Sequence, residues 1–548
     1  MPTLTINGKP LEFEQGKSIL DVALENEIEI PHYCYHPGLT APANCRICLA
    51  EVWAPNPRND NKLESFGKLV PTCRTDAIDG AVVSTESPKS IANQKAVMEY
   101  LLINHPVDCP VCDQAGECHL QDYSYQYGRG QARFTEQKIK QPKKDIGPHV
   151  LLYSDRCIMC TRCVRFTREV TGTGELIVEG RGAMEQIDVF PGKALDNPLS
   201  GNVIDICPVG ALLDKDFLFQ QRVWFLEKTP SIDGLTCSGD NISIEHNKGQ
   251  VYRVKPRANL DVNRYWITDE QRYGWSFVHD DARLRLPAIK GDEPFALEEA
   301  AVAYDNAYAA AIDGLSRARK IGLLVSPMLS CEDAYALAKM ALDINPDAVL
   351  AVGPVPIEGE DQTFKDGYTM YAEKAPNARG VRRVLEAMAP NGTVLDADAY
   401  LKAAAKHDFD AAIVTGNYPS NWVTDETVKA LKEPYLVVID TLPNTLTSRA
   451  NVVLPGATWM EKAGTFENVH GRLQAFDRAI DPIDYVKSEA QIAYDLMAVR
   501  TGETPTVYNP TAMRQTLATE HGLSMFVTDV HLPEITHVVE SDMAMVEL

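Results

Sequence analysis

The sequence predicts a multi-domain protein that is α+β in its first part and α/β in its last. At 548 residues the chain is too long for one hydrophobic core, because single domains usually stop growing near about 250–300 residues. Eleven of its thirteen cysteines lie before residue 210. Beyond about residue 225, apolar strand-like runs alternate with helical ones, which is typical of a layered domain with a parallel sheet.

The composition narrows the classes of function. The chain has 45% hydrophobic and 24% charged residues, as soluble globular proteins do, and a formal net charge of -23. That charge argues against binding to nucleic acid or anionic lipid, and its ordinary role is solubility. No run approaches the ~18 apolar residues of a membrane span, and the first residues do not resemble a signal peptide. A membrane complex could hold this chain only as a peripheral part.

Local patterns predict the secondary structure in chain order. Residues 3–30 predict a hairpin that turns at Asn7-Gly8, followed by a helix. Residues 55–62 are polar and predict an exposed hairpin tip, and residues 88–104 predict a helix with proline at its start. Farther along, the predicted strands are 321–325, 411–414 and 435–439, and the predicted helices are 298–311, 334–342 and 424–431.

A first set of cysteines lies at Cys34, Cys45, Cys48 and Cys73. Plant-type two-iron ferredoxins have a similar C-x2-C core and a distant fourth cysteine. Short C-x2-C loops suit a cluster because successive backbone N–H groups can point at the sulfurs. Four cysteines could equally bind zinc, but the preceding hairpin and helix favour a two-iron cluster.

A second set has one histidine and three cysteines, at His105, Cys109, Cys112 and Cys118. Its rivals are a zinc site of the same composition and a histidine with a purely structural role. If the set binds a cluster, imidazole in place of one thiolate removes a negative charge and should raise the reduction potential. His119 follows a ligand directly and is expected to point elsewhere.

A third set is the most specific signal in the chain. Cys157, Cys160 and Cys163 form the compact C-x2-C-x2-C run of a four-iron ferredoxin. Position 167, where a fourth cysteine would follow, holds threonine. A distant donor is expected in such sites, and Cys207, which precedes a proline, supplies it. Zinc is rarely held by three cysteines at this interval, so the set predicts a four-iron cluster.

Four motifs contain these residues: N-C-R-I-C-L-A-E-V at 44–52, H-P-V-D-C-P-V-C-D-Q at 105–114, C-I-M-C-T-R-C-V-R-F at 157–166 and I-C-P-V-G-A-L at 206–212. In this order they resemble the large iron–sulfur subunit of respiratory complex I, the proton-pumping NADH:quinone oxidoreductase. The resemblance is close from residue 2 to about residue 270 and looser beyond.

The resemblance implies four domains and three clusters. The domains are a [2Fe-2S] ferredoxin-like (β-grasp) domain at 1–80, a histidine-plus-three-cysteine [4Fe-4S] domain at 81–140, a [4Fe-4S] ferredoxin-like domain at 141–218, and a degenerate, cofactor-free α/β domain like that of molybdopterin oxidoreductases at 219–548. By the same resemblance, the first set of ligands holds one [2Fe-2S] cluster, and the second and third sets each hold a [4Fe-4S] cluster.

The resemblance also implies a function. Electrons would leave NADH at an NADH/FMN-binding subunit, enter this chain and pass along its clusters toward quinone. The chain would be an electron carrier without catalytic residues, within a multi-subunit enzyme. Its implied partners are that flavin subunit, a small [2Fe-2S] subunit and the connecting subunits of the hydrophilic arm. Its implied place is peripheral, on the cytoplasmic side of the inner (plasma) membrane.

Some relatives carry a further four-iron cluster at the start of the last domain. Alignment by eye places its ligand positions at Asp233, Thr236, Asp240 and Thr268, none of which is cysteine. Cys237 is off register, so no extra cluster is expected near it. We therefore expect Cys237 and the equally isolated Cys331 to be buried core residues.

Three other functions remain open at this point. The chain could be the relay subunit of an NAD-linked hydrogenase, part of a molybdenum or tungsten formate dehydrogenase, or a zinc scaffold without redox activity. Two alanines also stand where many relatives of the resembled family have glycine, at positions 43 and 115. Their presence matters only if those backbones need a positive φ.

Overall fold

The computed structural model describes residues 1–290, 301–389 and 393–533. The chain divides into two compact units, one of Met1–Leu226 with Thr363–Tyr368, the other of Glu227–Gln362 with Thr369–Leu548. In the described part of the chain, no helix combines the length and apolar character needed to cross a membrane.

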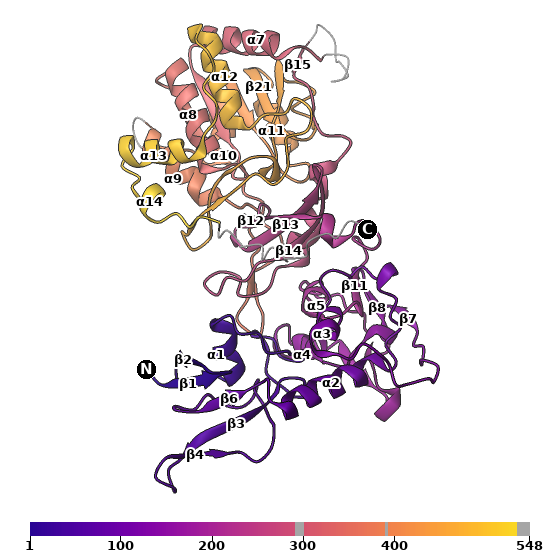
Figure 1. Cartoon of the computed structure of the whole chain (residues 1–548). Coiled ribbons are helices and arrows are strands. Elements are labelled where there is room, and N and C mark those ends of the chain that lie inside the picture. The colour runs from indigo at the N-terminus through magenta and orange to yellow at the C-terminus, as the bar shows by residue number, and fades with distance from the viewer. Residues whose placement is uncertain (291–300, 390–392, 534–548) are drawn as a thin grey trace, which may run out of the picture. The chain divides into compact units, whose positions relative to one another are not determined.

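The first unit begins with a mixed sheet in the order β2-β1-β6-β3-β4, with β5 beside β3 (Figure 1). Its strands are β1 (Thr3–Ile6), β2 (Lys9–Glu12), β3 (Leu49–Asn56), β4 (Lys62–Ser65), β5 (Val70–Pro71) and β6 (Val82–Ser84). Helix α1 (Ile19–Glu25) starts at a capping box in which Ser18 and Asp21 bond each other's backbone N–H. The apolar face of α1 packs with the sheet in one core, and β1 pairs with β6 in parallel, as in a β-grasp fold.

The rest of the first unit is built from short elements around the cysteine loops. They are α2 (Pro88–Leu102), α3 (His119–Tyr127), β7 (Lys143–Asp145), β8 (Val150–Tyr153), α4 (Arg162–Glu169), β9 (Leu176–Glu179), β10 (Gln186–Val189), α5 (Asn202–Ile206) and β11 (Leu212–Asp214). Strands β11, β8 and β7 form one small sheet, and β9 and β10 form a hairpin. Regular elements this short leave much of the backbone in loops, where most of the cysteines lie; Cys163 is on α4.

The second unit starts with an antiparallel sheet and continues with a parallel one. The first elements are β12 (Glu227–Ile232), β13 (Asn241–Asn247), β14 (Gln250–Pro256) and α6 (Asp269–Tyr273). The larger sheet has the order β15-β22-β21-β20-β16-β17, parallel except for β15. Its strands are β15 (Ala288–Ile289), β16 (Ile321–Val325), β17 (Val349–Val352), β20 (Ala411–Thr415), β21 (Tyr435–Asp440) and β22 (Val452–Pro455).

Helices cover both faces of this parallel sheet. Alternate strand residues such as Leu323 and Ile413 pack on one side with α7 (Tyr304–Arg317), α8 (Cys331–Ile344), α9 (Ala378–Met388), α12 (Glu489–Thr501) and α13 (Pro510–Glu520). Their neighbours Leu324 and Val414 pack on the other side with α10 (Ala397–Ala405) and α11 (Asp425–Ala430). Strands buried on both faces are nearly all apolar, which explains why the sequence shows them as continuous runs. The remaining elements are β18 (Gln362–Thr363), β19 (Thr369–Met370), β23 (Gly464–Glu467), β24 (Leu473–Phe476) and α14 (Met525–Thr528).

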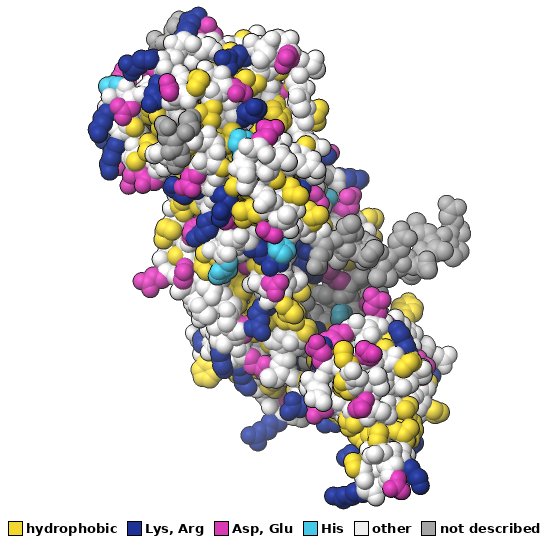
Figure 2. All heavy atoms as spheres, turned by 90° about the vertical axis from the view of Figure 1, so that its left-hand side faces the viewer, with side chains coloured by type: hydrophobic (Ala, Val, Ile, Leu, Met, Phe, Trp, Pro, Cys, Tyr) yellow, Lys and Arg dark blue, Asp and Glu magenta, His cyan; other side chains and the backbone are white. Residues whose placement is uncertain are grey.

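Most predicted elements are present, and one is misplaced. The hairpin at Asn7-Gly8, the hairpin tip after β3 and the three predicted strands of the parallel sheet are confirmed. The helix predicted at 298–311 begins instead at Tyr304 and continues to Arg317. Part of that prediction, residues 298–300, lies outside the described residues. On the face drawn in Figure 2, basic and acidic side chains are interspersed.

Candidate metal centres

The first set of cysteines is gathered in one place. Cys34, Cys48 and Cys73 are buried, and the Sγ atoms of Cys48 and Cys73 are 3.6 Å apart. The sulfur of Cys34 is hydrogen-bonded to the thiols of Cys45 and Cys73. It also accepts hydrogen bonds from the backbone N–H groups of Asn44 and Cys45. Thiol contacts combined with backbone donors suit a cluster whose sulfurs carry negative charge.

Left-handed residues shape the loops that hold these sulfurs. Ala43 and Arg46 flank Cys45 with φ of 54° and 58°, and Met159 and Thr161 flank Cys160 with φ of 55° and 61°. Such turns aim successive N–H groups into one concavity; the N–H of Met159, for example, lies 3.4 Å from Cys157 Sγ. Position 43 therefore does need a positive φ, where glycine would be unstrained, whereas Ala115 does not have one.

The cysteines of the second set lie in one short loop region. Cys109 and Cys112 begin and follow the 3-10 turn η1 (Cys109–Val111), and Cys118 precedes α3. The sulfur of Cys118 accepts from the N–H groups of Leu120 and Gln121. No described contact joins His105 to these cysteines, but its Nδ1 is buried without a hydrogen-bond partner, as expected of a free ligand atom. The Nδ1 of His119 is in the same state, so geometry alone does not choose between the two histidines.

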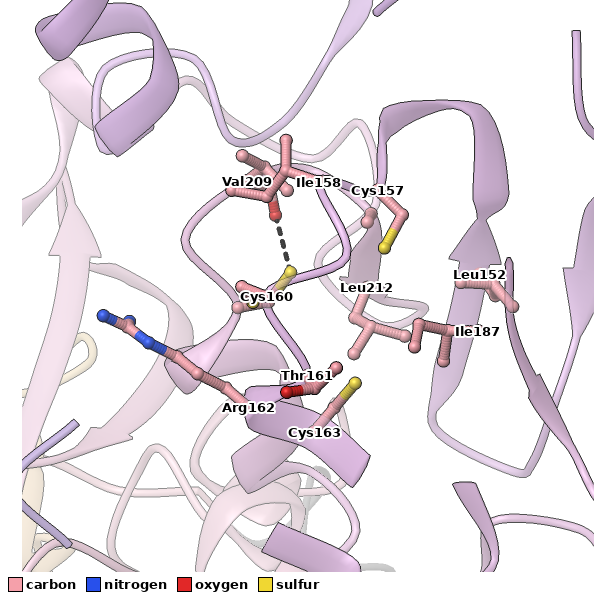
Figure 3. Close-up of a pocket in the computed structure, with 12 residues that line it drawn as sticks. Leu152, Cys157, Ile158, Cys160, Thr161, Arg162, Cys163, Ile187, Val209 and Leu212 are labelled. Atoms are coloured by element: carbon pink, nitrogen blue, oxygen red, sulfur yellow. Dashed lines mark hydrogen bonds between the residues drawn. The ribbon is translucent and has the colours of Figure 1, made fainter. Parts of the chain in front are cut away.

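The third set lines one apolar cavity (Figure 3). All four predicted ligands line this cavity, together with side chains such as Leu152, Ile187 and Leu212. The cysteines concerned are Cys157, Cys160, Cys163 and Cys207. The dashed line in Figure 3 joins the Val209 carbonyl oxygen to the sulfur of Cys207, 3.0 Å away. The chain thus brings a residue 44 positions beyond Cys163 to the site predicted for it.

Burial disfavours the charged thiolate form of several of these cysteines, so a bound cation is needed to stabilise it. Burial raises the pKa of Cys118 to about 12 and that of Cys160 to about 11, and it raises the pKa of Cys163 well above the ordinary thiol value. Iron binds thiolate, so it must offset this burial cost with its own charge. Among the described residues, no group of three or more His, Cys, Asp or Glu side chains is placed to hold a single metal ion. A donor set of buried cysteines around an apolar cavity fits a cluster, which is larger than one ion.

Four arginines that we did not predict support the cysteine loops. Arg156 pairs with Asp108 at 2.6 Å, and Arg222 donates to the carbonyl oxygens of Cys112 and Pro110. On α4, Arg165 donates to the carbonyl oxygens of Cys34 and Cys160, and Arg162 to those of Tyr35 and Ile206, which neighbour ligands of the first and third sets. For three of them, Arg156, Arg162 and Arg165, the sequence signal is that basic residues alternate with the cysteines at 156–165.

The four positions aligned with a further cluster also lie close together, around the side-chain amide of Gln271. Asp233, Thr236, Asp240 and Thr268 are all buried. The Nε2 atom of Gln271 donates to Asp233 Oδ2 and Asp240 Oδ2, each at 2.9 Å, and to Thr236 Oγ1 at 3.3 Å. Its Oε1 accepts from the N–H of Thr268 at 2.7 Å. Cys237, buried as predicted, takes no part in these bonds.

The carboxyl ends of the parallel strands form the usual ligand crevice of such a sheet. Here polar side chains fill it. Asp440 Oδ1 accepts from the N–H groups of Asn417 and Thr441, each at 2.8 Å. Its Oδ2 accepts from Trp422 Nε1 at 3.1 Å and from Asn444 Nδ2 at 2.8 Å. Cys331, the first residue of α8, is buried as predicted and lies next to Asn377.

Models of five protein families match the chain. Their descriptions and the residues matched are 2Fe-2S iron-sulfur cluster binding domain (1–88), NADH-ubiquinone oxidoreductase-G iron-sulfur binding region (94–133), NADH-quinone oxidoreductase subunit 3, ferredoxin-like domain (147–213), NADH-ubiquinone oxidoreductase NDSU1/NuoG-like, 4Fe-4S domain (226–276) and Molybdopterin oxidoreductase (377–499). These matches confirm the predicted fold class, in the predicted order along the chain.

Curated relatives match about half of the chain. The mitochondrial NADH dehydrogenase [ubiquinone] iron-sulfur protein 1 of Solanum tuberosum is 42% identical over 286 residues, 52% of this chain and 37% of the relative. The mitochondrial NADH-ubiquinone oxidoreductase 78 kDa subunit of Neurospora crassa is 41% identical over 56% of this chain and 40% of its own length. The NADH-ubiquinone oxidoreductase 75 kDa subunit of Reclinomonas americana is 41% identical over 53% and 40%. The matches thus span about two fifths of the length of these relatives.

One solved structure is a distant neighbour. It is titled as the crystal structure of an NAD+-reducing [NiFe]-hydrogenase in the H2-reduced state, and it covers 40% of this chain and 91% of its own at 27% identity. Its TM-score of 0.35 is too low to carry an argument.

Proposed function

We propose, from the premise that this chain belongs to the large iron–sulfur subunit family (G or 75-kDa type) of NADH:quinone oxidoreductase, that it relays electrons from an NADH-oxidising flavin subunit toward quinone. The observation that carries the proposal is the apolar cavity lined by four cysteines from both ends of the third domain. When a buried set of thiolates of this kind holds a cluster, the cluster can accept and release an electron without any covalent bond being made or broken.

The proposal assigns three clusters. Cys34, Cys45, Cys48 and Cys73 would hold a [2Fe-2S] cluster; His105, Cys109, Cys112 and Cys118 a [4Fe-4S] cluster; and Cys157, Cys160, Cys163 and Cys207 a second [4Fe-4S] cluster. The family matches establish that both [2Fe-2S] and [4Fe-4S] binding domains are present. The convergence of the first and third sets supports the assignment of individual residues.

We further propose that no fourth cluster and no molybdopterin is bound. Two carboxylates and two threonines stand at the aligned cluster positions, and Gln271 already satisfies them. A cluster there would lack thiolate ligands and would have to displace a buried hydrogen-bonded network, which is costly. In the crevice of the parallel sheet, Asp440 has its carboxylate oxygens taken by the chain itself, and the indole of Trp422 lies against it.

The wider setting follows from the same family. The partners would be the NADH/FMN-binding subunit, the small [2Fe-2S] subunit and the connecting subunits of the hydrophilic arm of complex I. The chain would sit peripherally on the cytoplasmic side of the membrane that holds the complex. We retain the domain division at 1–80, 81–140, 141–218 and 219–548; the two compact units separate after Leu226, near the last of these boundaries.

Metal and sulfide counting tests the proposal. The purified chain should contain about ten irons and about ten sulfides, the content of one two-iron and two four-iron clusters. Stoichiometric zinc in a colourless preparation would instead support the scaffold function, and molybdenum or tungsten would support a formate dehydrogenase. About fourteen irons would mean that the site around Gln271 binds a cluster after all.

A substitution of His105 tests the second set. In His105→Cys, a fourth thiolate adds a negative charge to the cluster, so its potential should fall by on the order of 100 mV while the iron content stays the same. Redox titration followed by electron paramagnetic resonance measures the shift.

His119 provides the matched control, since its Nδ1 is also buried without a partner. The substitution His119→Gln should leave the potential of this cluster unchanged. If His119→Gln shifts the potential and His105→Cys does not, the ligand assignment of the second set is wrong.

A further inference from the structure

Two arginines on α4 are buried between the first and third sets of cysteines. Arg162 and Arg165 are only 6% and 9% exposed. Arg165 donates through Nη1 to the carbonyl oxygen of Thr40, and through Nη2 to those of Cys34 and, at 3.5 Å, Cys160. One guanidinium thus touches the backbone of a ligand from each set.

Arg162 makes a related but different bridge. Its Nη2 donates to the carbonyl oxygen of Tyr35, next to Cys34, and its Nη1 to that of Ile206, next to Cys207, at 3.2 Å. Figure 3 shows its side chain leading away from the cavity of the third set. We therefore infer that Arg162 mainly joins two loops. Arg165 is the arginine expected to affect both the first and the third cluster sites.

Neither guanidinium has a carboxylate partner in the part of the chain that the structure describes. Glu169, one turn along α4 from Arg165, acts on the guanidinium through its charge but without a direct ion pair. Its carboxylate accepts hydrogen bonds from the N–H and hydroxyl of Thr40. The Nε atoms of both arginines are buried without a partner. Carbonyl oxygens satisfy hydrogen bonds but carry no full charge, so a buried cation without a counter-charge would be strongly destabilising.

The buried arginine beside the second set, in contrast, is neutralised by a carboxylate. This residue, Arg156, forms an ion pair with Asp108 at 2.6 Å, and its Nη1 donates to the Gly210 carbonyl oxygen. A neutralised arginine contributes little net charge to its surroundings, whereas an unpaired one acts at full strength in a low-dielectric interior.

We propose that the charge of Arg165 is balanced by the two cluster sites it bridges, and that it sets the reduction potentials of both together. The inference rests on the proposed function, because it needs clusters at Cys34 and Cys160. Four thiolates leave each site with negative charge that grows by one on reduction. A nearby cation stabilises the more negative state, so Arg165 raises both potentials.

The test is a redox titration of the intact complex by electron paramagnetic resonance, with iron counted in every sample. In Arg165→Gln, which removes the charge but keeps an amide donor, both the first and third clusters should be harder to reduce. At a fixed electrode potential their reduced-to-oxidised ratios should fall about tenfold, which equals 59 mV for one electron. The second cluster serves as the internal reference and should not shift.

The substitution Arg165→Lys separates charge from hydrogen bonding. Lysine keeps the charge but loses the planar fork, so both potentials should stay near those of the parent even if the complex is less stable. If Arg165→Gln assembles too poorly to titrate, the lysine variant still decides, because lowered potentials there would overturn the proposal. Unchanged potentials in Arg165→Gln, or an equal shift of all three clusters, would also overturn it.

This outcome is distinguishable from a failure of the proposed function. A parent protein without iron refutes the relay itself. If this chain carries its three clusters in the parent but their potentials do not change when Arg165 is replaced, only the electrostatic role is refuted.

Discussion

Replacing Cys160 by alanine should stop electron flow from NADH to quinone while leaving ferricyanide reduction at the flavin site intact. Cys160 lines the apolar cavity of the third set, where no other described thiol outside that set is available to take its place. Changes beyond the direct ligands of metal sites already cost about 10–100-fold, so loss of a ligand should lower quinone reduction at least about 100-fold. Ferricyanide accepts electrons upstream of this chain and should be reduced at the parental rate.

The control for this variant is another buried cysteine. Cys237 is 1% exposed and belongs to none of the three sets, so Cys237→Ala should keep the parental iron content and quinone reduction. Iron counting on Cys160→Ala should show a loss of up to about four irons, the content of one cluster. A Cys160→Ala complex that kept all its iron and its quinone activity would remove Cys160 from the ligand set.

Replacing Lys462 by methionine should destabilise the second unit by about 3–5 kcal/mol, the usual cost of breaking a buried ion pair from one side. The ammonium of Lys462 lies 2.9 Å from Asp333 Oδ2 and also bonds Glu489. All three side chains are at most 2% exposed. Without the lysine, two carboxylates would remain buried side by side with no cation between them.

The cost should depend on pH because Glu489 titrates in the accessible range. Burial raises the pKa of Glu489 from 4.5 to about 7, against the opposing charge of Lys462. A carboxyl whose pKa is raised by folding binds more protons in the folded than in the unfolded state. Its contribution is therefore fully present below pH ~4.5 and is lost as the pH rises through about 7.

The substitution Lys462→Met removes the charge that holds this pKa down, so the loss of stability should continue above pH 7. Urea unfolding of the full chain at pH 6 and pH 8 measures this, and the gap between variant and parent should be wider at pH 8. The double variant Lys462→Met with Glu489→Gln is the control, because it removes one of the stranded charges and should recover part of the loss. A gap that is equal at both pH values would show that Glu489 does not titrate as described.

The sequence was sufficient for features that are written in local spacing. The C-x2-C-x2-C run, the turn at Asn7-Gly8 and the apolar run of β16 each depend on residues within a few positions of one another. For such features the local backbone geometry decides the structure, since residues close together in the chain have few ways to arrange themselves. The start of α7 was misjudged for a related reason: alanine favours a helix but does not say where it begins, and here the helix begins only after Ala303, without a side-chain cap.

What only the tertiary structure decided concerns residues far apart in the chain. Nothing local predicts that Arg165 reaches the carbonyl oxygen of Cys34, or that Gln271 gathers Asp233 and Asp240 around one amide. The sequence determined which thiols could bind iron, because a sulfur's chemistry belongs to the residue itself. Folding determined which charges surround them and which side chains meet around Gln271, because electrostatic energy depends on distance in space and not on separation along the chain.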